Sequence, residues 1–158
     1  MLMLEDSLYR GKLLRDCDLG IVKLDFIDYD TTVTQALEKL NFEKKLEKIK
    51  KIIIKPNLLQ DAPPPCTTDV RCVEAFIKYV VRRKSDIELV IIEGSGGCDT
   101  ERAYKTLGYK VLEKRYKVRL VDVDNCELVR LENKDALAYK EVYLPSEVLD
   151  GFFVSIPS

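Results

Sequence analysis

Residues 51–59 (KIIIKPNLL) and 88–94 (ELVIIEG) decide the fold that this sequence predicts. Each stretch contains a run of β-branched or aliphatic residues without the polar alternation of a half-exposed strand. Such runs are typical of parallel strands that are covered on both faces. Pro56 ends the first strand, because proline cannot donate to a sheet ladder. We therefore predict two central strands of a parallel sheet.

Further strands and amphipathic helices are predicted around these two strands. Residues 20–27 (GIVKLDFI) alternate apolar and polar side chains, which predicts a first strand with one buried face. Asp30 or Thr31 can then cap one helix, whose apolar side chains recur at helical spacing as far as Leu46. A second predicted helix can be capped by Thr67, Thr68 or Asp69 and has apolar residues from Val70 to Val81. A third is predicted to begin at Asp99 or Thr100 and to end at about Leu107, where Gly108 provides a stop.

The last third of the chain is predicted to contain only strands. Residues 118–123 resemble another buried strand, residues 126–132 and 140–145 an antiparallel pair, and residues 151–156 a final strand. Alternating strands and helices predict one α/β domain over residues 1–158, a three-layer sandwich with a mainly parallel, Rossmann-like sheet. The chain stops directly after an apolar strand, which fits either a natural end or a truncated form of a longer architecture.

The composition disfavours several classes of function. With 26 Lys and Arg against 27 Asp and Glu, a net charge of −1 gives no overall attraction to nucleic acid or an anionic membrane. The absence of histidine excludes every triad that needs imidazole. No apolar run approaches the roughly 20 residues of a membrane span, and the first residues lack the features of a signal peptide. We expect a cytoplasmic protein, and its Lys and Glu bias is shared with thermophile proteins.

The cysteines predict free thiols, with a metal site as the alternative. Five cysteines are an odd number in a chain long enough to build its own core, which disfavours a disulfide framework. Cys66, Cys72 and Cys98 fall in or near the loops after the strands, and thiolates bind zinc and iron–sulfur clusters. However, no two cysteines have CxxC spacing, and Cys72 lies on the apolar side of its helix. The main prediction is therefore no metal site.

Polar residues gather in the loops that leave the predicted strands. In an open parallel sheet, ligands bind outside the carboxyl ends of the strands. Lys55 and Glu93 lie at the ends of two neighbouring strands, and we identify them as candidate catalytic groups, a countercharge for an anion and an acid or base. The candidate ligand-binding residues are Asn57, Thr67, Thr68, Ser95, Gly96, Gly97 and Thr100.

Each candidate also has a purely structural interpretation. Lys55 could extend to solvent at the sheet edge, or simply pair with Glu93. Gly96 and Gly97 precede a helix N-terminus, where uncovered N–H groups favour a phosphate or carboxylate, but they could equally turn the chain. The sequence contains neither a Walker loop nor a dinucleotide fingerprint, so it names no cofactor.

Four blocks of sequence resemble a known family. They are residues 52–59 (IIIKPNLL), 66–80 (CTTDVRCVEAFIKYV), 91–109 (IIEGSGGCDTERAYKTLGY) and 142–157 (VYLPSEVLDGFFVSIP). Together they resemble the domain-of-unknown-function family 362, bacterial and archaeal proteins often joined to ferredoxin-like iron–sulfur domains. The resemblance implies that the family's signature positions are Lys55, Asn57, Thr67, Thr68, Glu93, Gly94, Ser95, Gly96, Gly97 and Thr100.

The chain also departs from the family pattern. Asp69-Val70 stands where the family usually has a polar residue followed by proline, and Cys98 extends the glycine loop. Family members continue past the proline of Ile156-Pro157 with a lysine-rich segment and a further half, whereas this sequence closes at Ser158. The resemblance therefore implies that this polypeptide is either inactive alone or needs a second copy or a partner protein to cover its C-terminal edge.

Three hypotheses about function follow from these observations. The first is a domain, perhaps redox-associated, that binds a small anionic ligand or cofactor through Lys55 and the loop after Glu93. The second is an iron–sulfur or metal-binding electron carrier. The third is a non-catalytic binding or assembly module, because no catalytic constellation is complete.

Overall fold

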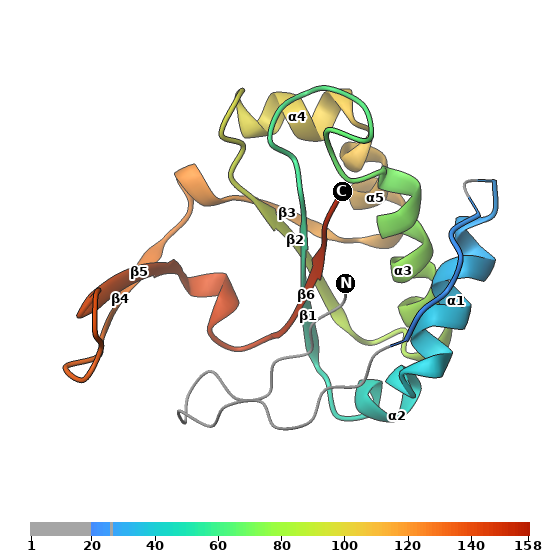
Figure 1. Ribbon diagram of the computed structural model, residues 1–158, viewed down its shortest axis with the longest axis horizontal. Coiled ribbons are helices and arrows are strands. Elements are labelled where there is room, and N and C mark those ends of the chain that lie inside the picture. The colour runs from blue at the N-terminus through green and yellow to red at the C-terminus, as the bar shows by residue number, and fades with distance from the viewer. Residues whose placement is uncertain (1–19, 26) are drawn as a thin grey trace.

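A four-stranded parallel sheet with helices packed against one face forms the body of the computed structural model, which describes residues 20–25 and 27–158 (Figure 1). The helices are α1 (Tyr29–Lys39), α2 (Phe42–Leu46), α3 (Val70–Arg83), α4 (Thr100–Thr106) and α5 (Tyr109–Tyr116). The strands are β1 (Lys51–Pro56), β2 (Glu88–Glu93), β3 (Arg119–Asp122), β4 (Leu128–Glu132), β5 (Glu141–Pro145) and β6 (Phe152–Ile156). Two 3-10 turns, η1 (Val123–Asn125) and η2 (Ser146–Val148), flank β4 and β5. Cys17 and the segment without signal-peptide features lie outside the described residues.

The parallel sheet has the strand order β3-β2-β1-β6. Ile53 of β1 lies opposite Val90 of β2 on one side and Phe153 of β6 on the other. The chain builds outward from β1 to β3 and then returns to the other side of β1, so the order reverses between β1 and β6. β4 and β5 form a separate antiparallel pair. The predicted α/β class, parallel sheet and antiparallel pair are confirmed.

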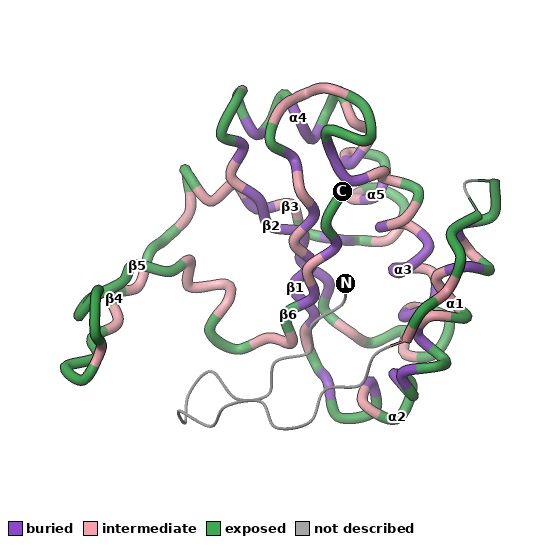
Figure 2. The backbone as a smooth tube through the Cα atoms, in the orientation of Figure 1, coloured by how far each residue is buried: buried purple, intermediate pink, exposed green. Residues whose placement is uncertain are grey.

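The two faces of the sheet bury different amounts of apolar surface. Most residues of β1 and β2 are buried (Figure 2). Because side chains alternate along a strand, Ile52 and Ile54 point to the face that the helices cover, and Ile53 points to the opposite face. The helix face contains the large core of the described residues. Among the described residues, the buried apolar cluster on the second face consists of Ile53, Val90, Ile92 and Val121, which pack against side chains from the chain after β3 and from η2.

The predicted first strand is wrong over the residues that the structure describes. Residues 20–25 and 27 join no sheet, and position 26 lies outside the described residues. The segment lies beside α1 instead, where Lys39 Nζ donates to the carbonyl of Ile21 at 3.0 Å. Ile21 and Ile27 are 76% and 95% exposed, so the apolar side chains of this segment do not form one buried face.

Two helix predictions also need correction. The single helix expected to run to Leu46 is broken at Asn41, which adopts the left-handed conformation (φ 49°) that asparagine tolerates. Asp28, rather than Asp30 or Thr31, caps its start by accepting the N–H of residue 31. Gly108 (φ 88°) ends α4, but α5 follows at once and was not predicted. The reason is that α5 shows a narrow apolar stripe among charged side chains.

Candidate functional site

The carboxyl ends of β1 and β6 mark the topological switch of the sheet. Crossovers on either side of a switch point leave in opposite directions and open a crevice at the strand ends, where α/β proteins bind ligands. Lys55 of β1 lies opposite Ser155 of β6, one residue before the strands end. The chain that connects β3 to β6 carries the antiparallel pair and no α-helix. The topology therefore places Lys55 at the expected ligand position.

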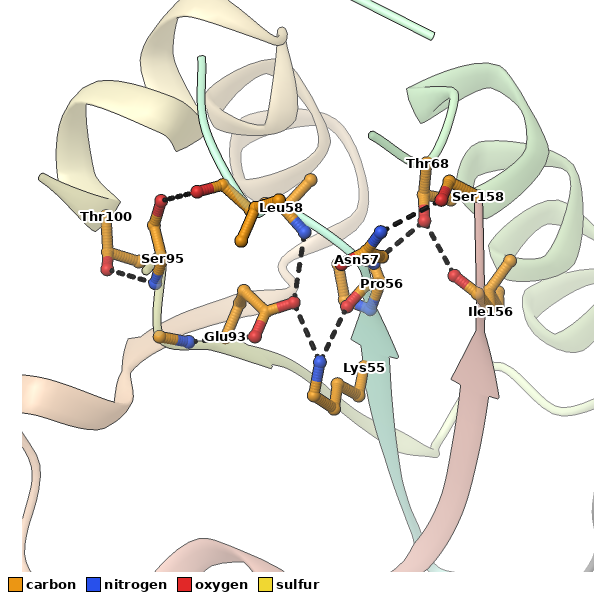
Figure 3. A network of polar contacts seen from close by, with 12 residues as sticks. Lys55, Pro56, Asn57, Leu58, Thr68, Glu93, Ser95, Thr100, Ile156 and Ser158 are labelled. Carbon is orange, nitrogen blue, oxygen red and sulfur yellow. Dashed lines mark hydrogen bonds and ion pairs between the residues drawn. The ribbon is translucent and has the colours of Figure 1, made fainter. Parts of the chain in front are cut away.

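Lys55 and Glu93 form an ion pair at this rim (Figure 3). Lys55 Nζ donates to Glu93 Oε2 at 2.9 Å and to the Pro56 carbonyl at 3.1 Å. Glu93 also accepts the backbone N–H groups of Leu58 (3.1 Å) and Gly94 (3.0 Å). The Lys55 side chain is 43% exposed and that of Glu93 only 7%. The buried carboxylate thus fixes an ammonium group that keeps a third N–H for another partner.

Thr68 and Asn57 connect the loop after β1 to the end of β6 (Figure 3). Thr68 Oγ1 accepts the N–H of Asn57 and donates to the Ile156 carbonyl, at 2.8 and 2.7 Å. The Asn57 side-chain amide donates to Ser158 Oγ at 2.9 Å. Thr67 is buried and donates to a carbonyl within its own loop, so it lies apart from Lys55. The two buried threonines therefore hold the loop in place through bonds to protein groups.

The glycine loop after β2 is tied to the chain after β1. Ser95 Oγ and Gly97 N–H both donate to the carbonyl of Leu59, at 3.0 and 2.7 Å. Ser95 N–H donates to Thr100 Oγ1 at 3.0 Å. A Cβ at Gly97 would lie 2.8 Å from that carbonyl oxygen, so only glycine permits the approach. Three of the predicted ligand-binding groups are therefore engaged with protein, while Gly96 is exposed.

Two buried tyrosines form hydrogen bonds to backbone carbonyls of β3 and of the loop after β1. Tyr104 of α4 donates to the Val121 carbonyl at 2.8 Å, and Tyr109 of α5 donates to the Thr68 carbonyl at 3.2 Å. Burial raises the pKa of both phenols well above the ordinary value, so both remain donors. The helix that was not predicted thus positions Thr68.

The four cysteines that the structure describes do not come together. Cys66 is exposed, and Cys98 Sγ lies 3.2 Å from Ser95 Oγ. Cys72, in α3, packs against the core on the helix face of the sheet. Burial raises the pKa of the Cys72 thiol to about 11, as expected of a core residue. Among the described residues, no three Cys, Asp or Glu side chains are arranged to hold a metal ion. The iron–sulfur and redox-associated hypotheses remain predictions without a supporting contact in the described part of the chain.

The charge at the two ends of the strands differs in sign. Around the carboxyl rim, residues 55–69, 93–102 and 122–125 contain seven acidic and two basic residues, a net charge of −5. At the amino edge, residues 44–51 and 82–88 contain eight basic and three acidic residues, a net charge of +5. A multiply charged anion is repelled by the carboxyl rim. The two ends of the sheet therefore offer opposite electrostatic environments.

A pocket of about 280 Å³ lies on the helix-covered side of the end of β6. Its walls are mostly apolar and come from residues 20–24, α1, α3 and residues 155–157. Of the predicted site residues only Cys72 lines it, so this pocket is distinct from the rim that carries Lys55 and Glu93.

A comparison with known protein families shows which family the chain belongs to. The family described as a domain of unknown function (DUF362) matches residues 52–158, which include all of the sheet except its first residue, Lys51, and also the rim and the antiparallel pair. The chain belongs to the DUF362 family. Comparisons with proteins of curated function and with solved structures found no match. The DUF362 relationship confirms the resemblance and assigns no activity to Lys55 or Glu93.

The described helices are all too short or too polar to cross a bilayer.

The catalytic roles predicted for Lys55 and Glu93 stay predictions, although the two side chains form an ion pair. Two partners at the rim of this DUF362 chain were missed, the Leu59 carbonyl and Ser158. A backbone carbonyl has no sequence signal, and a terminal serine gives no indication of what it contacts.

Proposed function

We propose that the carboxyl rim of this sheet binds a small ligand that carries a single anionic group, which contacts Lys55. The observation that supports the proposal is the fixed, 43% exposed Lys55 side chain at the β1/β6 switch point. The proposed ligand is a carboxylate or a monoanionic phosphate ester, because the net charge of −5 on the surrounding rim segments repels more highly charged anions.

Glu93 has a positioning role in this proposal. Its carboxylate accepts from Lys55 Nζ and from two backbone N–H groups, of Leu58 and Gly94. The Glu93 carboxylate thus joins the loops after β1 and β2 and fixes the position of the Lys55 ammonium group at the rim. Proton transfer by Glu93 is the finer possibility that follows only if a ligand displaces one of these donors.

Ligand-induced stabilisation tests the proposal. Thermal melts would be recorded at about pH 5.5 with acetate, inorganic phosphate and adenosine monophosphate, because the two phosphates then carry mainly one negative charge. At about ten times the dissociation constant, a ligand stabilises the fold by roughly 1.4 kcal/mol and raises the melting temperature by roughly 3 to 6 °C. Lys55→Gln keeps a donor for Glu93 but removes the positive charge, so we expect it to abolish the shift.

Lys50→Gln is the matched control, because Lys50 is an exposed lysine at the opposite edge of the sheet. This variant makes the same change in net charge and should keep the wild-type shift. Equal loss in both variants would mean that the anion responds only to overall charge. An unchanged shift in Lys55→Gln would refute the proposal.

A further inference from the structure

One acidic side chain of the carboxyl rim has no partner in the described part of the chain. The three rim segments contain seven acidic residues. Six of the carboxylates accept a hydrogen bond or form an ion pair within the protein, namely those of Asp61, Asp69, Glu93, Asp99, Glu101 and Asp122. The carboxylate of Asp124 has neither contact to a described residue, and Asp124 is exposed. It is therefore the acid of the rim that can bind a ligand without breaking a contact.

The turn η1 holds Asp124 at the rim. Asp122 Oδ1 accepts the N–H of Asp124 at 3.0 Å, and Asp122 Oδ2 accepts the side-chain amide of Asn125 at 2.6 Å. An aspartate that accepts a backbone N–H two residues ahead stabilises a turn of this kind. Asp122 thus uses both oxygens to fix the turn, which leaves the next carboxylate in a defined place.

Gly94 lies between the Lys55 ammonium group and the Asp124 carboxylate. On one side Glu93 joins the first two, because its carboxylate accepts from Lys55 Nζ at 2.9 Å and from the Gly94 N–H at 3.0 Å (Figure 3). On the other side, a Cβ added at Gly94 would lie 3.7 Å from Asp124 Oδ1 and 3.2 Å from the Val123 side chain. The two opposite charges therefore flank a position that has no side chain of its own.

These groups can be reached from the same side of the sheet. Because side chains alternate along a strand, Lys55 and position 94 share the second face with the apolar cluster around Ile53. Val123, the neighbour of Asp124, packs against the same cluster. A small ligand that lies over Gly94 on this side can contact Lys55 and Asp124 together.

We infer that the ligand of the rim is an amino carboxylate, whose carboxylate contacts Lys55 and whose ammonium group contacts Asp124. The inference rests on the proposed function, because Lys55 supplies the contact to the anion. A zwitterion has no net charge, so the net charge of −5 on the rim segments does not repel it as it repels a simple anion.

The spacing of the strands sets the length of this ligand. Two strand spacings, about 10 Å, separate β1 from β3, and charge-assisted hydrogen bonds of about 2.8 Å at each end leave roughly 4 to 5 Å between the two charges of the ligand. An amino carboxylate with three carbons between its charged groups, such as 4-aminobutanoate, has about this separation. Butanoate has the same carbon chain without the ammonium group and is the matched anion.

Titration of both compounds into ¹⁵N-labelled protein, followed by nuclear magnetic resonance at constant, low ionic strength, tests the inference. We expect 4-aminobutanoate to have a dissociation constant at least about threefold lower than that of butanoate. The amide shifts should include Gly94 and Asp124. Lys55→Gln should abolish the binding of both compounds.

Asp124→Asn separates the contact to the ammonium group from the contact to the anion. This variant should weaken the binding of 4-aminobutanoate at least about threefold and strengthen that of butanoate up to about twofold. The changes have opposite signs because the same carboxylate attracts the ammonium group and repels the anion. Asp86→Asn is the matched control, since Asp86 is an exposed acid at the amino edge of the sheet, and it should leave both dissociation constants unchanged.

The outcomes distinguish this inference from the proposed function. Equal affinities for the two compounds, or equal effects of Asp124→Asn and Asp86→Asn, would overturn the inference, whereas loss of binding in Lys55→Gln would still support the proposed function. Binding that Lys55→Gln leaves intact would overturn both. The absence of any saturable shift with either compound would also overturn both.

Discussion

The two faces of the parallel sheet are built from neighbouring residues of the same strands, yet different contacts hold them. Ile52 and Ile54 pack under α1 and α3 in a continuous apolar core. Ile53 packs under a thin cover that ion pairs of Glu147 hold in place. The helix face therefore supplies most of the stability, and the second face is covered by a few side chains of the loops and of η2. The two faces meet at the carboxyl rim, where Lys55 extends from the second face and Glu93 from the helix face.

Truncating adjacent core residues gives the largest expected effect. Ile54→Ala should reduce the free energy of unfolding by about 4 kcal/mol, because the helices enclose the cavity it leaves. Ile53→Ala should cost about 2 to 3 kcal/mol, because the 3-10 turn η2 can move into the space. Urea unfolding measures both. Equal losses would show that the cover of the second face is as rigid as the helix layer.

Removing the carboxylate that joins the faces is expected to have the next largest effect. Glu93→Ala leaves the N–H groups of Leu58 and Gly94 without their acceptor, which should cost about 2 to 3 kcal/mol. Glu93→Gln keeps an acceptor oxygen and should cost about 1 kcal/mol. A loss below about 0.5 kcal/mol in Glu93→Ala would contradict the positioning role, again by urea unfolding.

The ion pairs on the second face predict a pH dependence of stability. Hydrogen bonds from Arg119 and Lys51 lower the pKa of Glu147 from 4.5 to about 2. A folded-state pKa below the unfolded value means that the contribution is complete above pH 4.5 and is lost as the pH falls toward 2. Because solvent screens the cluster, we expect a contribution of ~1 kcal/mol. Glu147→Gln should flatten this part of the profile in urea unfolding at pH 2 to 6. An unchanged slope would contradict the prediction.

Thiol labelling compares the two faces with the smallest perturbation. Cys72 packs against the core of the helix face, and burial raises the pKa of its thiol to about 11. Cys126 packs on the second face, where burial also raises its pKa. At pH 8 the thiolate fraction of Cys72 is about 0.1%, so an aromatic disulfide reagent should label it far more slowly than Cys126 in single-cysteine variants. Faster labelling of Cys72 would mean that the helix face opens readily.

Long runs of apolar residues predicted the central strands correctly, whereas a single segment of alternating apolar and polar residues wrongly predicted a strand. Residues 51–56 and 88–93 form strands as predicted, because only a doubly covered strand uses every side chain of such a run. Residues 20–25 have strand-like alternation but pack beside α1, a tertiary choice that local pattern does not contain. α5 was missed because its buried side chains, Tyr109 and Leu112, are few among lysines and glutamates.

The candidate site was predictable only as far as strand ends determine it. Parallel strands place their carboxyl ends together, so Lys55 and Glu93 could be expected at one rim. The order reversal between β1 and β6 was not evident, since it depends on the long connection through β4 and β5. The ties from Ser95 and Gly97 to the Leu59 carbonyl could not be predicted either, because backbone acceptors carry no residue identity.

Mapping ligand contacts by nuclear magnetic resonance tests most directly whether Lys55 at the β1/β6 switch binds an anion. Acetate and inorganic phosphate would be titrated into ¹⁵N-labelled protein while backbone amide shifts are recorded. We predict saturable changes that are largest at Asn57, Gly94 and Ser158 and that disappear in Lys55→Gln. Changes confined to the basic amino edge, residues 44–51 and 82–88, or no saturable change at all, would contradict the account.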